Sequence, residues 1–417
     1  MQLDLDMWLA EMEAAHPDPY TRISREAFHA RVREARARLP DNLDPVEYFA
    51  VLQGLASALR DGHTQFQLPE QSAAYSDDWF PLSLRVQDGR VFVDRARADI
   101  ARGCEITRIN GMPAARILDT ARGLVSAEIA SGDELAASMF VPVLWLAGVR
   151  APFRIEGLSD ARQPIDLVLD ARIPPSDPPE RPPYRLDWLE GGVAYLAIHD
   201  MTDANGFAAF AQDAFEAIAQ KRAKGLVVDL RENIGGDTEV GALLLDRITK
   251  KPHRMIAEKH WHVSARQQAQ MIESGYAARD YVAAPIGTTL HYRDGPMRSP
   301  RVVAPTFRGP VCVLIGSHTE SSAMMLANAI EDYHLATLIG EPTASPPNYF
   351  GEVLAFHLRR TRLEADVSTA RFVRANGDAT NTNPVMPDIV VHQSVDEWLR
   401  DEDAVLRRAL AWIATGR

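Results

Sequence analysis

Apolar residues recur at helical spacing through roughly the first 66 residues of the chain. Phe28, Val32, Ala35 and Leu39 form one apolar stripe on a segment that is otherwise rich in arginine and glutamate. Spacings of three and four residues are typical of a helix that buries one face. The pattern therefore predicts a helical N-terminal region.

A second helix is predicted from about residue 44, because its start carries three signals. Asp44 can cap the helix, Pro45 suits the first helical position, and Glu47 completes an Asp-x-x-Glu capping box. The glycine in the run Asp-Gly-His-Thr at 61–64 then ends the helix. His63 is therefore expected on a turn just beyond a helix, where an imidazole can point into a cleft.

From about residue 78 to 175 the pattern changes to short strands. Apolar runs on either side of Asp88-Gly89 predict a β-hairpin over residues 82–93. Residues 103–111 predict a strand that runs into an Asn-Gly turn. The proline-rich run at 173–183 can form neither a helix nor a central strand, so it is the linker candidate.

After residue 184, continuous apolar strands alternate with helices. Strands are expected at 193–198, 226–230, 311–315 and 336–339, and helices at about 205–222, 238–249 and 321–333. This alternation indicates a largely parallel α/β core. A β-hairpin over 351–375 and a terminal helix over 395–416 complete the predicted elements.

Composition narrows the class of protein. The 417 residues include 45 Lys+Arg and 57 Asp+Glu, a formal net charge of −12, and 46% are hydrophobic. This indicates a folded, soluble protein and excludes nucleic acid or an anionic membrane as partner, since both need a basic face. The longest apolar run, at 140–149, is too short for a membrane span. Because the N-terminus lacks a signal-peptide pattern, the chain is expected to be cytoplasmic, or periplasmic or secreted if a signal was removed.

The two cysteines, Cys104 and Cys312, are too few for a disulfide framework or a zinc ribbon. The sequence also lacks a phosphate-binding loop and an HExxH metal motif. No metal and no cofactor are therefore expected.

Three segments combine residue types that can carry out acyl transfer. They are the His63 turn, a buried strand that ends in Gly235-Gly236, and a strand that runs directly into a helix at Ser321. A serine at a helix start sits where N–H groups and the positive helix end converge, which stabilises an oxyanion. The Gly-Gly turn lets another N–H approach without a Cβ in the way. A neutral imidazole can deprotonate the serine.

Each of these signals also has an ordinary structural explanation. A serine that opens a helix is more often a cap, and a strand that ends in Gly-Gly is usually only a tight turn. One histidine among twelve is more often structural than catalytic. The joint occurrence of the three signals, in this order, favours catalysis.

Taken together, the motifs give the chain a close resemblance to the S41 serine peptidases. This family includes carboxyl-terminal processing proteases, tricorn-type proteases and interphotoreceptor retinoid-binding protein modules. The matching runs are Asp-Gly-His-Thr at 61–64, Gly-x-Glu-Ile-x-x-Ile-Asn-Gly at 103–111, Asp-Leu-Arg-x-Asn-x-Gly-Gly at 229–236, Thr-x-Ser-Ser-Ala at 319–323 and Gly-Glu-Pro-Thr at 340–343. The resemblance covers nearly the whole chain.

The resemblance implies an α/β fold with a ClpP/crotonase-like ββα core. It also implies an N-terminal helical region at 1–70 that carries His63, a PDZ-like β-rich insert at 78–175, and a catalytic α/β core at 184–417. By the same resemblance Ser321 is the nucleophile, and Ser322 is the neighbour that could be confused with it. Gly236 and the N–H of Ser322 match the oxyanion-hole donors. His63 matches the histidine of the tricorn-like branch, in which an imidazole activates the serine.

The lysines decide between two branches of the family. Ser–Lys members use a lysine downstream of the serine, but this chain has Pro346 at that position and none of its five lysines follows Lys259. Arginine cannot take over, because its guanidinium stays protonated. The sequence therefore predicts a Ser–His pair.

The acid that orients the histidine is less clearly marked. The acid often found one helical turn after the nucleophile is replaced by Met324. Glu352 is preferred as the group that orients His63, and Asp378 is the other candidate.

The sequence thus predicts a serine peptidase that cleaves peptide or protein substrates through an acyl-enzyme. Two alternatives stay open. One is a non-catalytic module of the same fold that binds an apolar ligand, which the loss of an acid at Met324 would suit. The other is an esterase or amidase that acts on small molecules with the same groups.

Overall fold

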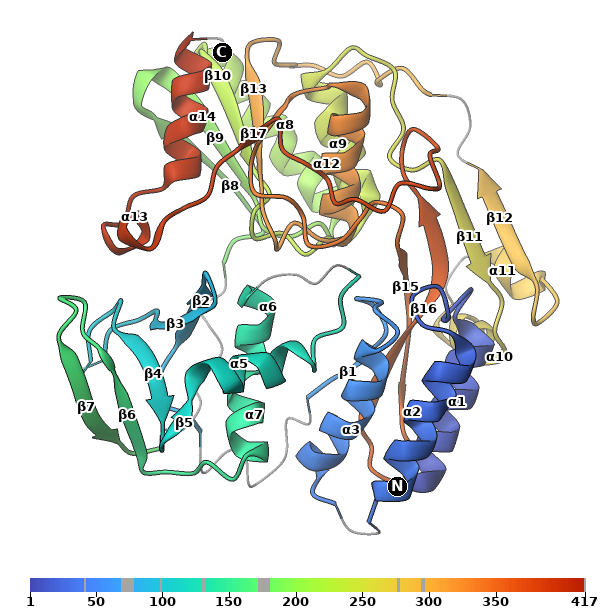
Figure 1. The fold of residues 1–417 in the computed structure, drawn as a ribbon. Coiled ribbons are helices and arrows are strands. Elements are labelled where there is room, and N and C mark those ends of the chain that lie inside the picture. Colours follow the sequence, from blue (N-terminus) through green and yellow to red (C-terminus); the bar gives the residue numbers. More distant parts are fainter. Residues whose placement is uncertain are drawn as a thin grey trace. The chain divides into compact units, whose positions relative to one another are not determined.

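The computed structural model describes residues 1–40, 43–68, 79–97, 100–128, 133–171, 181–275, 278–293 and 297–415 (Figure 1). Its contacts divide the chain into two compact units. The first unit comprises Met1–Pro178, His262–Thr288 and Glu352–Thr369, and the second comprises Pro179–Trp261, Thr289–Gly351 and Ala370–Arg417. Most of the linker predicted at 173–183 lies outside the described residues.

The first unit begins with three helices, α1 (Gln2–Ala15), α2 (Arg25–Arg38) and α3 (Pro45–Ser57). The predicted capping box opens α3, where Asp44 accepts from a helix N–H and Glu47 accepts from the N–H of Asp44. The apolar faces of the helices share one core with strands β15 (Phe350–His357) and β16 (Glu364–Val373). Its members include Trp8, Phe28, Phe49, Leu52, Leu354 and Val367. The prediction of a helical N-terminal region is confirmed.

The segment that follows holds a sheet with the strand order β2-β3-β4-β6-β7, and β5 pairs with β4. The strands are β2 (Leu84–Gln87), β3 (Arg90–Val93), β4 (Glu105–Ile109), β5 (Met112–Pro113), β6 (Phe153–Leu158) and β7 (Pro164–Leu169). The predicted hairpin is confirmed, because β2 and β3 pair antiparallel across Asp88-Gly89.

Three helices in the same segment were not predicted, namely α5 (Ala114–Arg122), α6 (Asp133–Ser138) and α7 (Phe140–Leu146). Each is short, so its apolar period is hard to distinguish from that of a strand. They bury residues such as Ile117, Phe140 and Val143 in one core with the sheet.

The second unit is built on a six-stranded sheet of order β17-β14-β13-β10-β9-β8. Its strands are β8 (Tyr184–Leu189), β9 (Val193–Ile198), β10 (Gly225–Asp229), β13 (Val311–Ile315), β14 (Thr337–Gly340) and β17 (Ile389–Val390), with the short helix η1 (Glu190–Gly192) between β8 and β9. Neighbouring strands from β9 to β17 are parallel, whereas β8 pairs antiparallel with β9. The predicted, largely parallel α/β core is confirmed.

Helices cover both faces of this sheet (Figure 1). On one face, α8 (Ala204–Gln220), α9 (Thr238–Ile248) and α12 (Ser321–Tyr333) pack beside one another. On the other face, α14 (Ala404–Thr415) buries Val405 and Ala409 against β10 and β13. The prediction of a single C-terminal helix is wrong, because α13 (Val395–Leu399) precedes α14 as a separate helix. Asp401 between them has a φ of 56°, and Asp403 accepts the N–H of Leu406 to start α14.

A third sheet has the strand order β1-β16-β11-β12, and β15 pairs with β16. Its other strands are β1 (Gln65–Phe66), β11 (Glu258–His262) and β12 (Thr289–Arg293), and α10 (Ala265–Ser274) and α11 (Arg279–Ala283) lie between β11 and β12 in the sequence. β15 and β16 confirm the hairpin predicted over 351–375. The boundary between the two units falls inside β11, β15 and β16.

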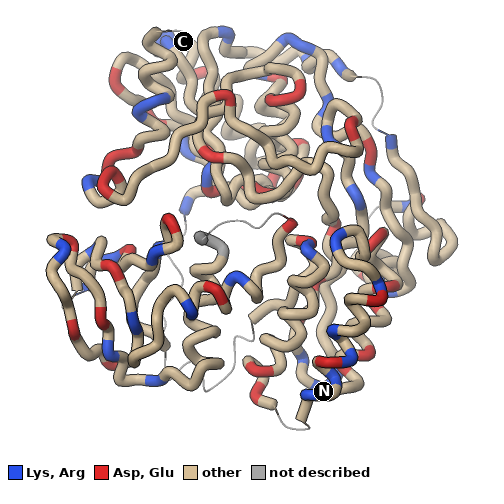
Figure 2. Tube along the Cα trace, viewed as in Figure 1, with Lys and Arg blue, Asp and Glu red and all other residues tan. Residues whose placement is uncertain are grey.

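Acidic and basic residues are interspersed along both units (Figure 2). Of the helices that the structure describes, none combines the length and the apolar character needed to cross a bilayer.

Candidate active site

Ser321 stands at the junction between β13 and α12 in the second unit. The turn of residues 316–320 is fixed by Thr319, whose buried hydroxyl donates to the carbonyl of Leu230 (2.9 Å) and accepts the N–H of Gly316 (3.0 Å). Ser321 itself has a φ of 48°, in the left-handed region that residues other than glycine avoid. Strained backbone of this kind gathers where a side chain is held in a functional orientation.

Neither serine at this helix start acts as its cap. The N-cap residue is Glu320, which makes no side-chain hydrogen bond to the first turn. The Ser322 hydroxyl instead donates to the carbonyl oxygen of Gly236, at 2.5 Å. The ordinary explanation of these serines as helix caps therefore does not apply.

Gly235 and Gly236 lie close to the start of α12. Their φ angles are 104° and 135°, which L residues with a side chain rarely adopt. A Cβ on Gly235 would lie 2.7 Å from the Cβ of Ser321, and one on Gly236 would lie 2.4 Å from the carbonyl carbon of Met201. Both positions therefore require glycine, for conformation and for space.

Asn233 holds this turn from inside and is fully buried. Its Oδ1 accepts the N–H of Gly235 (2.8 Å), and its Nδ2 donates to the carbonyl of Ile198 (2.8 Å). Its backbone carbonyl accepts the N–H of Glu320 (3.0 Å). One residue thus connects the end of β9, the glycine turn and the start of α12.

Backbone pairing decides which way Gly236 faces. Met201 and Gly236 form a parallel bridge, in which the N–H of Met201 donates to Gly235 (3.1 Å) and the N–H of Asp237 donates to Met201 (2.6 Å). The residue between two such groups turns its own N–H and C=O to the opposite side. The carbonyl of Gly236 there meets the Ser322 hydroxyl. Its N–H therefore also faces the start of α12, where the N–H of Ser322 lacks an intrahelical acceptor.

His63 belongs to the first unit and follows α3 on a turn built around Asp61. One oxygen of this buried carboxylate accepts the N–H of His63 (3.0 Å), and the other accepts the hydroxyl of Thr64 (2.5 Å). The second oxygen also bonds Nε2 of His16 (3.0 Å), whose Nδ1 accepts the N–H of Asp18, so Nε2 carries the proton. Burial raises the pKa of Asp61, but the hydrogen bond from His16 and the nearby imidazoles outweigh it, so the pKa lies below its ordinary value.

Two more carboxylates lie close to this turn. Glu128 is buried and accepts the N–H of Gly62 at 3.2 Å. One oxygen or nitrogen atom from each of Asp61, His63 and Glu128 lies within 4.8 Å of the others. Burial raises the pKa of Asp366 in β16, and the charge of His63 partly opposes this rise.

Glu352, the acid preferred from the sequence, also belongs to the first unit. Its φ is 54°, and its carbonyl accepts the hydroxyl of Thr369 at 2.6 Å. The neighbouring residue of β16, Ser368, donates its N–H to Thr64 (3.1 Å). The His63 turn and the backbone of Glu352 are thus attached to adjacent residues of one strand.

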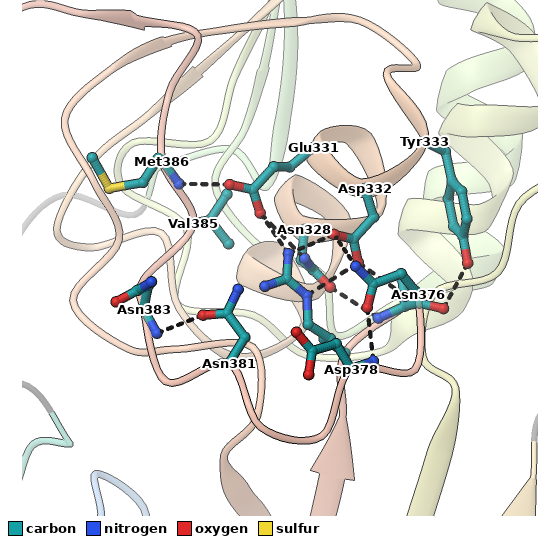
Figure 3. A network of polar contacts seen from close by, with 12 residues as sticks. Asn328, Glu331, Asp332, Tyr333, Asn376, Asp378, Asn381, Asn383, Val385 and Met386 are labelled. Atoms are coloured by element: carbon teal, nitrogen blue, oxygen red, sulfur yellow. Dashed lines mark hydrogen bonds and ion pairs between the residues drawn. The ribbon is translucent and has the colours of Figure 1, made fainter.

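Asp378, the other candidate acid, lies in the second unit, on a segment fastened to α12 (Figure 3). Asp332 accepts the N–H of Asn376 (2.9 Å), and the hydroxyl of Tyr333 donates to the carbonyl of Ala375 (2.6 Å). The carboxylate of Asp378 accepts the N–H and the hydroxyl of Thr380, which hold its pKa below the usual value.

Comparison with known proteins now bears on the resemblance. Residues 192–391, which include Gly235, Gly236, Ser321 and Ser322, match the model of peptidase family S41. Over this stretch the chain is similar to peptidase family S41. The resemblance predicted from the sequence is therefore confirmed.

The chain also resembles individual proteins. It is 24% identical over 362 residues to carboxyl-terminal-processing peptidase 1, chloroplastic, of Arabidopsis thaliana, a match that spans 81% of this chain and 61% of that relative. The chain thus spans about three fifths of the relative's length. Mature CPAF shares the fold with a TM-score of 0.67 at 14% identity, over 99% of this chain and 97% of that one. CPAF complexed with lactacystin gives a TM-score of 0.68 at 14% identity, over 100% and 99%.

Sequence reasoning missed several residues around Ser321 and around His63. Asn233 and Thr319 lie within the motifs that carry the resemblance, so their positions were visible but their hydrogen bonds were not. Asp61 was read only as part of a helix end. Glu128 follows a segment without any motif, and only the folded chain brings it to Gly62.

Proposed function

We propose that this chain is a serine peptidase of family S41 with Ser321 as its nucleophile. The observation that carries the proposal is the start of α12. There Ser321 adopts a strained backbone directly against Gly235, and the N–H of Gly236 faces the same place. The peptidase is favoured over a non-catalytic module for an apolar ligand, because every part that the reaction needs at this helix start is present.

The proposed reaction follows from these groups. His63 takes the proton of the Ser321 hydroxyl, and Oγ attacks the carbonyl carbon of a peptide bond. The N–H groups of Gly236 and Ser322 donate to the oxyanion that forms. When the C–N bond breaks, His63 passes the proton to the leaving amine and an acyl-enzyme remains. Water, deprotonated by His63, then attacks the ester and frees Ser321.

Histidine is the proposed base because a Ser–Lys pair lacks its lysine. Pro346 stands where such a lysine is expected, and the five lysines of the chain all precede residue 260. For the group that orients His63, the sequence favours Glu352. The hydrogen bond from Gly62 also makes Glu128 a candidate for that role.

The finer architecture is part of the proposal. A ClpP/crotonase-like core at 184–417 would carry Ser321, and the region 1–70 would carry His63. The sheet of β2 to β7, in the predicted domain at 78–175, would be a PDZ-like insert that captures a peptide terminus by adding it as an edge strand. Peptides or proteins are the proposed substrates, as the name of the Arabidopsis thaliana relative indicates for that protein.

Labelling with a fluorophosphonate tests the nucleophile. Wild type should be labelled, Ser321→Ala should not, and Ser322→Ala should keep a labelled Ser321. His63→Ala should be labelled far more slowly than wild type. Absence of labelling in wild type, or its loss only in Ser322→Ala, would refute the assignment.

Two further measurements separate the alternatives. Cleavage of a peptide library by wild type but not by Ser321→Ala supports a peptidase, whereas turnover of small esters alone points to an esterase or amidase. A lipid that copurifies with an unlabelled wild type points to a binding module.

A further inference from the structure

The side chain of Ser322 has a use that the proposed reaction does not assign to it. In that reaction only its backbone N–H takes part. Ser322 is 4% exposed. Its hydroxyl donates to the carbonyl of Gly236, in the turn that follows β10. A serine at the second position of a helix has no need of such a distant acceptor, because its hydroxyl can bond within its own turn.

The bond fixes the last polar group of the glycine turn. The Gly235 N–H is held by Asn233, the Gly235 carbonyl by Met201, and the N–H of Asp237 by Met201 as well. The Gly236 carbonyl is the remaining acceptor, and the Ser322 hydroxyl occupies it.

The turn needs this restraint because glycine is conformationally free. Gly236, at a φ of 135°, has no Cβ to limit rotation about its backbone. The Gly236 N–H shares a trans peptide plane with the Gly235 carbonyl, so its direction is set by the bond from Met201. The bond from Ser322 attaches the Gly236 carbonyl to the first turn of α12 and so holds this N–H beside Ser321.

We infer that the Ser322 hydroxyl is a positioning group that holds the Gly236 N–H beside the oxyanion formed on Ser321. The inference rests on the proposed function. It assigns two roles to Ser322, a backbone donor to the oxyanion and a side chain that keeps the other donor in place. It also explains why a second serine follows the nucleophile.

The test compares variants of the full chain by their rate of fluorophosphonate labelling. The reagent forms an O–P bond with Ser321 as fluoride leaves, and its phosphoryl oxygen occupies the oxyanion position. Ser322→Val removes the hydroxyl but keeps the shape of Ser322→Thr, which retains it, so this pair isolates the hydrogen bond. Ser264→Ala removes another buried serine hydroxyl, which caps α10, and serves as the control.

We expect Ser322→Val and Ser322→Ala to be labelled about tenfold to a hundredfold more slowly than wild type, as for a misaligned oxyanion donor. Ser264→Ala should stay within about threefold of wild type, and Ser322→Thr should be labelled faster than Ser322→Val. Amide hydrogen exchange in the peptide that contains residues 233–237 should become faster only where the hydroxyl is lost. Equal labelling of Ser322→Val and Ser322→Thr overturns the inference.

The exchange measurement keeps the two proposals separate. If wild type is not labelled at all, the proposed function fails, and exchange at residues 233–237 still reports on the bond. Unchanged exchange in Ser322→Ala and Ser322→Val would then overturn the positioning role, and faster exchange would support the restraint of the turn.

Discussion

The backbone of Ser321 adopts a conformation that costs free energy in the folded state. Left-handed φ costs a residue with a Cβ about 1–2 kcal/mol relative to glycine. A Cβ on Gly235 would lie 2.7 Å from the Cβ of Ser321, so the glycine turn packs closely against the serine.

Replacement of Ser321 by glycine should therefore stabilise the protein. We expect Ser321→Gly to raise the free energy of unfolding by about 1 kcal/mol and to abolish labelling. Ser321→Ala loses the same hydroxyl but keeps the strained backbone, so urea unfolding of the two variants isolates the effect of φ. Equal stability of the two would show that the strain at Ser321 is negligible.

A pair of variants can identify the carboxylate that orients His63. We expect Glu128→Gln to slow fluorophosphonate labelling about tenfold, because it removes a negative charge beside an imidazole that becomes positive in the reaction. The amide oxygen can still accept the N–H of Gly62, so the turn keeps its shape. Glu352→Gln, measured in parallel, tests the residue favoured by the sequence. Slower labelling of Glu352→Gln alone would contradict the expectation for Glu128.

For single residues, the sequence predicted the role correctly where the structure permits only one type of residue. Gly235 and Gly236 were recognised because only glycine allows the approach, and the approach is observed. Glu128 could not be recognised, because a glutamate in a segment without a motif has the same pattern whether it is exposed or turned toward a histidine. Its role depends on a contact between segments far apart in the chain.

Among the elements, the turn of Gly235 and Gly236 is sensitive to added volume. Gly235→Ala places a Cβ 2.7 Å from Ser321 Cβ and 2.8 Å from Ser322 N, at a φ of 104°. We expect labelling to fall by about a hundredfold or more and stability by about 1–3 kcal/mol.

A matched variant separates strain from collision. Gly191→Ala also puts a side chain at positive φ (75°), but its Cβ would meet no atom within 4 Å. It should lose about 1 kcal/mol of stability and keep the wild-type labelling rate. If Gly235→Ala behaved in the same way, the close packing against Ser321 would be unimportant.

A buried cation is one of the groups that attach the segment from 374 to 386 to α12. The Arg374 side chain, 6% exposed, pairs with Glu331 and Asp332. We expect Arg374→Met to lower the free energy of unfolding by about 3–5 kcal/mol, because it leaves the buried Asp332 carboxylate without its cation. Arg122→Met breaks an exposed pair with Asp119 and should cost less than about 1 kcal/mol. Similar urea midpoints for the two variants would contradict this.

Elements with a long or uninterrupted pattern were predicted well. β9 and β13 have the expected bounds, because a fully buried parallel strand is a continuous apolar run between turns. The C-terminal helix was read as one, because Leu399, Leu406, Leu410 and Ile413 continue a single period across the break. The break arises from the backbone of Asp401 and the cap at Asp403, which periodicity does not register.

For the molecule as a whole, Asp61 links stability to pH. Its folded pKa lies below the ordinary value of 3.8, so its contribution to stability is present above that value and is lost as the pH falls through the folded pKa. We expect Asp61→Asn to destabilise the protein by about 2 kcal/mol or more at pH 7. The difference from wild type should shrink below about pH 4 in urea unfolding. A gap that stays constant down to pH 3 would show that the charge of Asp61 is not involved.

The resemblance to family S41 and the α/β class of this molecule could be predicted from the sequence, because both depend on local patterns and on the order of motifs. The grouping of the chain into units could not be read in the same way. Residues 262–288 and 352–369 share a unit with the N-terminus through contacts such as Arg266 to Glu11 and Thr361 to Asp4. Such long-range contacts leave no local signal.

The chain passes from one unit to the other five times, after residues 178, 261, 288, 351 and 369. Neither unit therefore corresponds to a continuous stretch of the gene. A fragment that starts at residue 184 would keep Arg266 and Thr361 but lose the acids they bond. Cleavage after residue 261, 288 or 351 would leave two polypeptides that each contain parts of both units. Such a nicked protein should migrate as one species in its native state and as two after denaturation.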